Sequence, residues 1–295
     1  MEKLKVIVVA VDLETQSDAP LARAAQLAAA HAAWLVVVHV IEGTAQSASG
    51  LPSGGSTDLN DRIKRHARDT IDSLVFEHGR TRRTDVVVEF GVPHDSIRHL
   101  AESRSADLIV IGPGNPRSLG ERMLGSTADR VIRTVPAPVL VVKKQPAKAY
   151  GRVAVAVDFS PQSAAALKEV RRLAPQAKLR LIHAVDIPAT FQQAMLRTGT
   201  SQAEIATFLS ARRDSARQEL SAFMDGLIDA GEASTLFLDG EPGRALVRFS
   251  TEQEFDLFAM GPHGRGLVRQ ALLGSVTQRV LSEAGCDVLI AGTEA

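Results

Sequence analysis

Short runs of aliphatic and β-branched residues recur along the chain, and longer stretches with helical spacing separate them. In the first half the apolar runs lie at residues 5–11, 35–40, 86–90, 108–111 and 139–142, and in the second half at 153–157, 179–185, 235–238, 257–260 and 288–291. Helical stretches lie between them, for example at residues 20–33, 59–78 and 95–103. Runs this continuously apolar are typical of strands covered on both faces. The alternation predicts an α/β fold with parallel strands.

The chain contains two copies of one unit. The opening segment KVIVVAVDLETQS recurs as RVAVAVDFSPQS, which aligns Asp12 with Asp158. Later, ADLIVIGPGNPRSLGERMLGSTADRVI recurs as FDLFAMGPHGRGLVRQALLGSVTQRVL at one constant offset. A constant offset over so many residues predicts two domains of the same fold. We place them at residues 1–145 and 151–295, joined by a short stretch that contains Pro and Lys.

Composition and charge narrow the class of protein. The 295 residues are 45% hydrophobic and 23% charged, which is ordinary for a globular protein with a buried core. Lys and Arg together number 34, as do Asp and Glu, so the net charge is zero. Without a long-range positive field we expect neither a nucleic acid nor an anionic membrane as partner.

The amino-terminal segment and the cysteine count bear on location and metal binding. The start of the chain turns acidic at Asp12 after a short apolar run, unlike a signal peptide or a membrane span. The single cysteine, Cys286, can form neither an internal disulfide nor a zinc cluster. We therefore expect a cytoplasmic protein with no metal site of its own.

Candidate ligand-binding residues of the second copy lie where its predicted strands end. In open α/β sheets, ligands bind beyond the carboxyl ends of the strands, and there Asp158 follows the first strand. The segment GPHGRGLVRQALLGS follows the fourth strand, and its glycines allow a backbone to approach a ligand closely. A further helix begins at Ser275, and the unpaired N–H groups of a helix N-terminus suit phosphate oxygens. Ser275 and Thr277 would add hydroxyl groups, and Arg265 a positive charge.

Two familiar phosphate-binding motifs are absent from this segment. The chain has no Gly-Lys-Ser/Thr, so it has no Walker A loop. Gly264 and Gly266 are followed by Arg269 where the dinucleotide-binding fingerprint needs a glycine. The segment therefore predicts a phosphate cradle of another kind.

The spacing Gly-x2-Gly-x9-Gly-Ser in the second copy resembles the nucleotide-binding signature of universal stress proteins. The Val-Ala-Val-Asp start, the Asp-Leu run before the signature and the closing hydrophobic strand are similar as well. The similarity covers both copies, so the chain resembles a tandem universal stress protein. The resemblance implies two doubly wound α/β domains, each a five-stranded parallel sheet of order 3-2-1-4-5 with helices on both faces.

The resemblance also implies a ligand, which is ATP or the related ADP or AMP, with Mg²⁺ held mainly by the phosphates. Asp158 would contact the base and ribose, and Val157 would contact the base through its backbone. The residues that would hold ribose and phosphate are Gly261, Gly264, Arg265, Gly274, Ser275 and Val276.

The first copy departs from the signature. The corresponding residues there are Asp12, Gly112, Gly125 and Ser126. The second glycine is replaced by Asn115, and Pro116 removes an N–H donor and stiffens the segment. We expect nucleotide binding to be weaker or absent in the first copy.

No residue pattern provides a nucleophile or a general base aimed at a phosphate. We therefore predict a stress-response sensor or adaptor that acts on an unidentified protein partner, not an enzyme. One alternative is an interaction module that binds another small molecule or a protein without nucleotide. A second is an ATP-dependent adenylating enzyme, although the residues after Asp158 lack the phosphate loop that such enzymes carry.

Other repeated residues favour structural roles. His39 and His183 end the second strands, where a packed and hydrogen-bonded histidine is favoured over a ligand, whereas His263 could contact a ligand or be solvated. The segments 91–93 and 240–242 predict tight turns that lead into helices, and the Gly/Ser-rich residues 43–58 predict a loop.

The last strand of each copy is expected to lie against the other, which would make the chain an intramolecular pseudo-dimer. This pairing would hide two sheet edges, and crosslinking of residues 139–142 to residues 288–291 would test it. Whether such a chain also forms a homodimer stays open.

Overall fold

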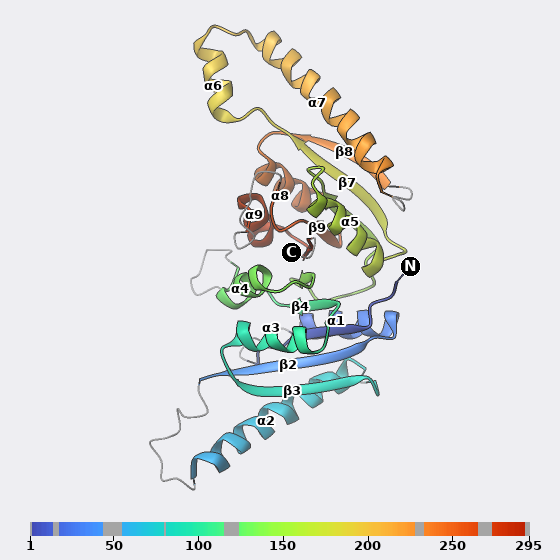
Figure 1. Cartoon of the computed structure of the whole chain (residues 1–295), viewed down its shortest axis with the longest axis vertical. Helices are drawn as coiled ribbons and strands as arrows, with labels where there is room; N and C mark the ends of the chain where they lie inside the picture. Colours follow the sequence, from blue (N-terminus) through green and yellow to red (C-terminus); the bar gives the residue numbers. More distant parts are fainter. Residues whose placement is uncertain are drawn as a thin grey trace. The chain divides into compact units, whose positions relative to one another are not determined.

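The computed structural model describes residues 2–13, 18–43, 55–79, 81–114, 124–227, 233–264 and 273–292. The chain divides into two compact units, one within Met1–Ala149 and the other within Tyr150–Thr293 (Figure 1). Each unit folds around a parallel sheet with its own buried strands, and we call them unit 1 and unit 2.

Unit 1 alternates strands and helices, as the apolar pattern predicts. Its elements are β1 (Val6–Ala10), α1 (Ala19–His31), β2 (Trp34–Glu42), α2 (Gly55–Glu77), β3 (Thr84–Gly91), α3 (Pro93–Ser103), β4 (Leu108–Ile111), α4 (Ser126–Thr134) and β5 (Val139–Val141). Parallel pairing joins them in the order β3-β2-β1-β4-β5. This order confirms the predicted 3-2-1-4-5 sheet.

Unit 2 repeats this topology, with one additional helix among the described residues. Its elements are β6 (Arg152–Ala156), α5 (Pro161–Leu173), β7 (Lys178–Val185), α6 (Ala189–Arg197), α7 (Gln202–Asp225), β8 (Ala233–Asp239), α8 (Pro242–Glu252), β9 (Leu257–Met260), α9 (Ser275–Glu283) and β10 (Asp287–Ile290). Parallel pairing gives the order β8-β7-β6-β9-β10, which is again 3-2-1-4-5 within the unit.

Both faces of each sheet are covered, which explains why the strands are so continuously apolar. In unit 1, α1 contacts β1, β2 and β4, whereas α3 contacts α4 and the strands β1 to β3. Because crossover connections between parallel strands are right-handed, a reversal of strand order moves the following helices to the opposite face. The central strands β1, β4, β6 and β9 are accordingly almost fully buried.

Local sequence signals set several of the helix starts. Proline stands in the first turn of α1, α3, α5 and α8, where its fixed φ suits the helix and its missing N–H is not needed. The α7 helix begins with a capping box in which Ser201 and Glu204 bond to each other's backbone N–H groups. The turn expected at residues 240–242 is present, and Gly240 adopts φ +106° there.

Two predictions about connecting segments need correction. The loop predicted at residues 43–58 ends sooner, because α2 already begins at Gly55; residues 44–54 lie outside the described part of the chain. The apolar pattern of the second copy did not reveal α6 and α7, which follow β7 in unit 2 (Figure 1). Most α6 side chains are exposed, so the helix lacks the buried stripe that makes a periodic pattern visible.

The repeated aspartate before the fourth strand of each unit has a structural role. Asp107 Oδ2 accepts hydrogen bonds from the backbone N–H groups of Lys5 and Val6 at 2.7 and 2.9 Å. Asp256 Oδ2 accepts equivalent bonds from Gly151 and Arg152, both at 2.8 Å. These carboxylates fix the start of the first strand, at the edge of the sheet opposite the predicted ligand site.

Within the described residues, no helix is long and apolar enough to cross a membrane.

Candidate functional site

In unit 2 the turn after β6 and the segment after β9 meet at the carboxyl ends of the strands. A Cβ atom placed on Gly264 would lie 2.9 Å from Asp158 Oδ2. The glycine backbone therefore lies beside the carboxylate, closer than a residue with a side chain would allow without a shift. Asp158 and Gly264, both predicted site residues, are brought together by the fold although they are far apart in sequence.

The two ends of the glycine-bearing segment are tied to each other. The backbone N–H of Gly274 donates to the Pro262 carbonyl at 2.9 Å. The hydroxyl of Thr277 donates to the Gly261 carbonyl at 3.1 Å. A Cβ on Gly274 would lie only 3.3 Å from the Cα of His263. These contacts bring the two ends of the segment, Gly261 and Gly274, close together.

Helix α9 begins directly after Gly274, so its N-terminus lies beside these hydrogen bonds. Gly274 is the N-cap residue and makes no side-chain capping hydrogen bond. Ser275 is exposed and Val276 is partly exposed, and both lie in the first turn of α9. The first N–H groups of a helix have no partner within the helix. The first turn of α9 can therefore accept an anion.

The Asp158 carboxylate is held in a fixed orientation. Its Oδ1 accepts hydrogen bonds from both the backbone N–H of Ser160, at 3.1 Å, and the Ser160 hydroxyl. Ser160 is itself the N-cap of α5, because its Oγ accepts the Ser163 N–H at 3.2 Å. The start of α5 thus orients the carboxylate with Oδ2 towards Gly264.

The backbone of Val157 already has partners. Its N–H donates to the Ile182 carbonyl at 2.9 Å, and its carbonyl accepts from His183 Nδ1 at 2.7 Å. A base contact through the Val157 backbone would therefore have to use the second lone pair of that carbonyl oxygen. In unit 1, His39 Nδ1 makes the equivalent bond to the Val11 carbonyl at 2.9 Å. These bonds confirm that His39 and His183 are hydrogen-bonded, as predicted.

His263, which lies against Gly274, has a ring nitrogen without a hydrogen-bond partner in the described part of the chain. This nitrogen is Nδ1, and it is buried. A buried nitrogen without a partner is costly. This atom is therefore a candidate contact for a bound ligand. Three residues named from the sequence, Arg265, Asn115 and Pro116, lie outside the described residues.

Unit 1 forms the equivalent hydrogen bond with the corresponding glycine, and a further glycine, Gly114, stands where unit 2 has His263. The N–H of Gly125 donates to the Pro113 carbonyl at 2.7 Å. Gly114 adopts φ +83°, and a Cβ there would lie 2.7 Å from the Cα of Gly125. Sequence reasoning missed Gly114, because the signature places its second glycine one residue later. The visible signal was the Gly-Pro-Gly run that begins at Gly112.

The remaining predicted residues of unit 1 occupy positions equivalent to those in unit 2. Ser126 begins α4, and its N-cap Gly125 also makes no side-chain capping bond. Asp12 follows β1 and is exposed. The close contact between carboxylate and glycine that marks unit 2 involves position 115 in unit 1, which is not described.

The helix after the third strand begins with a charged N-cap residue in unit 2 and an apolar one in unit 1. In unit 2, Glu241 caps α8: its carboxylate accepts the N–H groups of Gly243 and Arg244, both at 2.9 Å, and it pairs with Arg279 of α9 at 2.8 Å. Burial alone would raise the pKa of Glu241, but these hydrogen bonds and the nearby Arg279 and Arg244 outweigh it and lower the pKa. In unit 1 the N-cap of α3 is Val92, which has no capping side chain.

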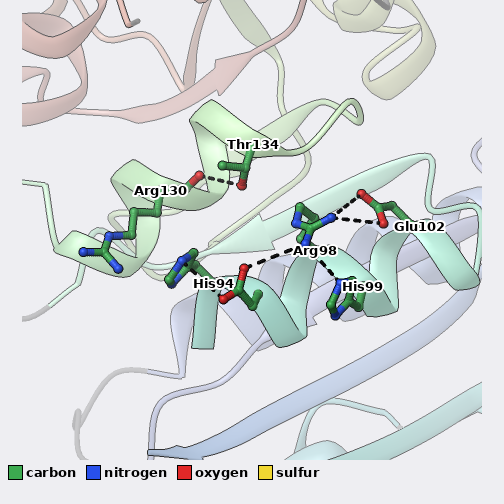
Figure 2. Close-up of polar contacts among 7 residues, drawn as sticks. His94, Arg98, His99, Glu102, Arg130 and Thr134 are labelled. Atoms are coloured by element: carbon green, nitrogen blue, oxygen red, sulfur yellow. Dashed lines mark hydrogen bonds and ion pairs between the residues drawn. The ribbon is translucent and has the colours of Figure 1, made fainter. Parts of the chain in front are cut away.

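The polar residues of α3 instead bond to one another along the helix (Figure 2). Arg98 donates to Glu102 at 3.1 Å and to His99 Nε2 at 3.0 Å, and it lies 3.8 Å from Asp95. His94 Nε2 lies 3.7 Å from the Asp95 carboxylate. Exposed pairs of this kind contribute little to stability. His94 and Arg98 are partly buried, whereas Asp95, His99 and Glu102 are exposed, so we assign this cluster no ligand.

In the part of the chain that the structure describes, no three or more His, Cys, Asp or Glu side chains gather in a way that could hold a metal ion.

Comparison with known proteins places both units in one family. The model of the universal stress protein family matches residues 3–143 and again residues 149–292. A universal stress protein of Mycolicibacterium smegmatis is 28% identical over 300 residues, which cover 96% of each chain. A universal stress protein of Mycobacterium tuberculosis is 26% identical over 297 residues, covering 97% of this chain and 96% of the relative.

Solved structures show the same fold. The crystal structure of a universal stress protein from Archaeoglobus fulgidus has a TM-score of 0.66 and 18% identity, and the match covers 99% of this chain and 97% of that one. A functionally unknown protein from Pseudomonas aeruginosa has a TM-score of 0.66 and 19% identity, with coverage of 99% and 93%. At these identities the likeness concerns the fold alone.

Proposed function

The chain belongs to the universal stress protein family, which matches nearly its whole length, and from this premise we propose that unit 2 binds ATP or a related adenine nucleotide. The observation that carries the proposal is the convergence of Asp158, Gly264 and the first turn of α9 at one edge of the sheet. A carboxylate that can bond ribose hydroxyls thus lies beside a helix N-terminus that can bond phosphates.

Three features of unit 2 fit such a ligand. The N-terminus of α9 has no side-chain cap, which leaves its first N–H groups for phosphate oxygens. Gly264 has no Cβ to block the space beside Asp158. His263 has a buried ring nitrogen, Nδ1, that has no hydrogen-bond partner in the described part of the chain, and a ligand could supply one. Ser275 and Val276 would contact phosphate through their N–H groups, and Mg²⁺ would accompany the nucleotide, bound mainly to its phosphates.

We propose that the protein acts as a sensor or adaptor in a stress response. A nucleotide that bridges the turn after β6 and the start of α9 would favour the conformation in which these segments lie together. As the fraction of molecules in this conformation rises, the surface that a partner protein recognises would change. We expect any phosphate hydrolysis to be slow, with turnover well below about 1 per second.

Isothermal titration of the full chain with Mg-ATP tests the proposal. We expect one site per chain, lost in Gly274→Val, because even the first atom of the new side chain would crowd the backbone of His263. Gly125→Val is the matched change in unit 1, where a Cβ would lie 2.9 Å from the Cα of Gly114, and it should leave the site intact.

The other outcomes of this titration are also informative. Two sites would mean that unit 1 binds as well, through the glycine arrangement centred on Gly114. No heat with ATP, ADP or AMP, from protein shown to carry no co-purified ligand, would refute nucleotide binding. It would favour the alternative of an interaction module.

A further inference from the structure

The residue after Asp158 has a backbone conformation that side chains rarely adopt. Phe159 has φ +64°, in the left-handed region, where the Cβ of an L-residue meets steric conflict. Such conformations persist where the surrounding structure fixes them, and they gather at ligand-binding sites. Here the strained turn places the Phe159 ring on the imidazole of His183, with ring centroids 4.5 Å apart and an interplanar angle of 29°.

Phe159 and His183 are the centre of a larger aromatic cluster, in which two further rings meet them edge-on. Phe223 of α7 lies 5.9 Å from Phe159, and Phe237 of β8 lies 6.1 Å from His183. All four side chains are partly exposed. Because His183 is fixed by its bond to the Val157 carbonyl, the cluster presents a rigid aromatic surface at the carboxyl ends of β6, β7 and β8.

In the described part of unit 1, the residues at the corresponding positions do not form this surface, and Leu13 does not share the positive φ of Phe159. The strand register pairs His39 with Val88 in unit 1 and His183 with Phe237 in unit 2. Leu13 follows Asp12 where Phe159 follows Asp158. The histidine and its bond to the first strand occur in both units, so they belong to the fold. The aromatic rings occur in the unit that also carries the complete glycine spacing.

We propose that Phe159, supported by His183, is the platform on which the planar base of the nucleotide stacks. The inference rests on the proposed function of unit 2. Asp158 connects the two halves of the site, because its carboxylate lies against Gly264 on one side and its chain neighbour is Phe159 on the other. The aromatic cluster would then bind the base, and the first turn of α9 would bind the phosphates.

Substitution of Phe159 in the full chain tests this assignment. One stacked base on an aromatic side chain is worth a roughly 10- to 100-fold difference in affinity. Phe159→Leu, which installs the residue of unit 1, should weaken ATP binding by about that factor. Phe159→Tyr keeps the ring and should bind ATP like the wild type. Binding of inorganic triphosphate, which has no base, should be the same in all three proteins.

Controls separate base binding from a purely structural role. Phe255→Leu removes a ring from another aromatic pair of unit 2, whose partner Phe249 lies 5.2 Å away, and it should leave ATP affinity unchanged. Phe159→Gly removes the ring and also the left-handed strain. It should therefore lose ATP affinity as Phe159→Leu does, while thermal unfolding shows that it remains folded.

The inference is overturned if Phe159→Leu binds ATP as tightly as the wild type, or if it weakens ATP and triphosphate equally. The first result would mean that the ring does not touch the base, and the second that Phe159 only holds the turn. Failure of the wild type to bind any nucleotide is a different outcome, because it refutes the proposed function itself and this inference with it.

Discussion

Replacement of Gly264 by alanine is a sharp test of the site geometry. The new Cβ would lie 2.9 Å from Asp158 Oδ2, whereas ordinary contacts begin at 3.4 Å, so one of the two groups must move by several tenths of an ångström. The carboxylate cannot rotate away freely, because Oδ1 bonds both the N–H and the hydroxyl of Ser160. Gly264→Ala should therefore displace Asp158 from its orientation.

The size of the effect follows from the bond that would be lost. A hydrogen bond to a charged group contributes about 1.5–3 kcal/mol, which corresponds to a roughly 10- to 100-fold change in dissociation constant. We expect Gly264→Ala to weaken Mg-ATP binding by about this factor, measured by isothermal titration. The fold should be little affected, because Gly264 is exposed and its φ is not in the left-handed region. Urea unfolding should show a loss below roughly 1 kcal/mol.

Gly226→Ala is the matched control in the same unit. Gly226 has φ −75°, and a Cβ there would meet only ordinary contacts at 3.6 Å. Alanine should raise the free energy of unfolding by up to about 1 kcal/mol and leave ATP affinity unchanged. Equal ATP affinity of Gly264→Ala and the wild type would refute the argument that Asp158 binds the nucleotide in the orientation described.

Two further predictions concern stability. Val92→Glu should stabilise the protein to urea by about 0.5–1 kcal/mol, because the new carboxylate can cap α3 as Glu241 caps α8; Val92→Gln is the uncharged control, and an equal gain from it would contradict a charge effect. Burial raises the pKa of Asp18, but hydrogen bonds from His78 and Gln145 outweigh it and lower the pKa. The stabilisation that ionised Asp18 provides is therefore fully present above the pKa that Asp18 has in the unfolded chain, and it is lost as the pH falls through the lower pKa of the folded state. The stability gap between wild type and Asp18→Asn should hold down to about pH 4 and close below it; a gap that persists at pH 2 would contradict this.

Much of the fold could be predicted from the sequence, because the responsible signals are local or periodic. Continuous β-branched runs mark strands buried on both faces, and the doubled pattern marks two units. Pro93 and Pro242, each after a strand-end turn, correctly marked the starts of α3 and α8. The exposed α6 left no periodic stripe and was missed.

The candidate site was predicted only in outline, since spacing gives residue types and not contacts. The sequence named Asp158 and Gly264, but the contact between them depends on β9 pairing beside β6. Sequence reasoning did not name Gly114. This residue has a positive φ and approaches Gly125 so closely that a Cβ atom would not fit. Sequence reasoning also assigned Val157 a backbone contact with the base without the information that its N–H and carbonyl already have partners.

The sequence by itself determined the two units, their α/β class and the residues at the strand ends, because periodicity and repetition need no tertiary information. Only the tertiary structure decided which of those residues meet. The stacking of Phe159 on His183 depends on β7 lying beside β6, and the pairing of Glu241 with Arg279 depends on α8 packing against α9. Parallel strands place residues distant in sequence at one edge of a sheet, and the distances there follow from strand order and register.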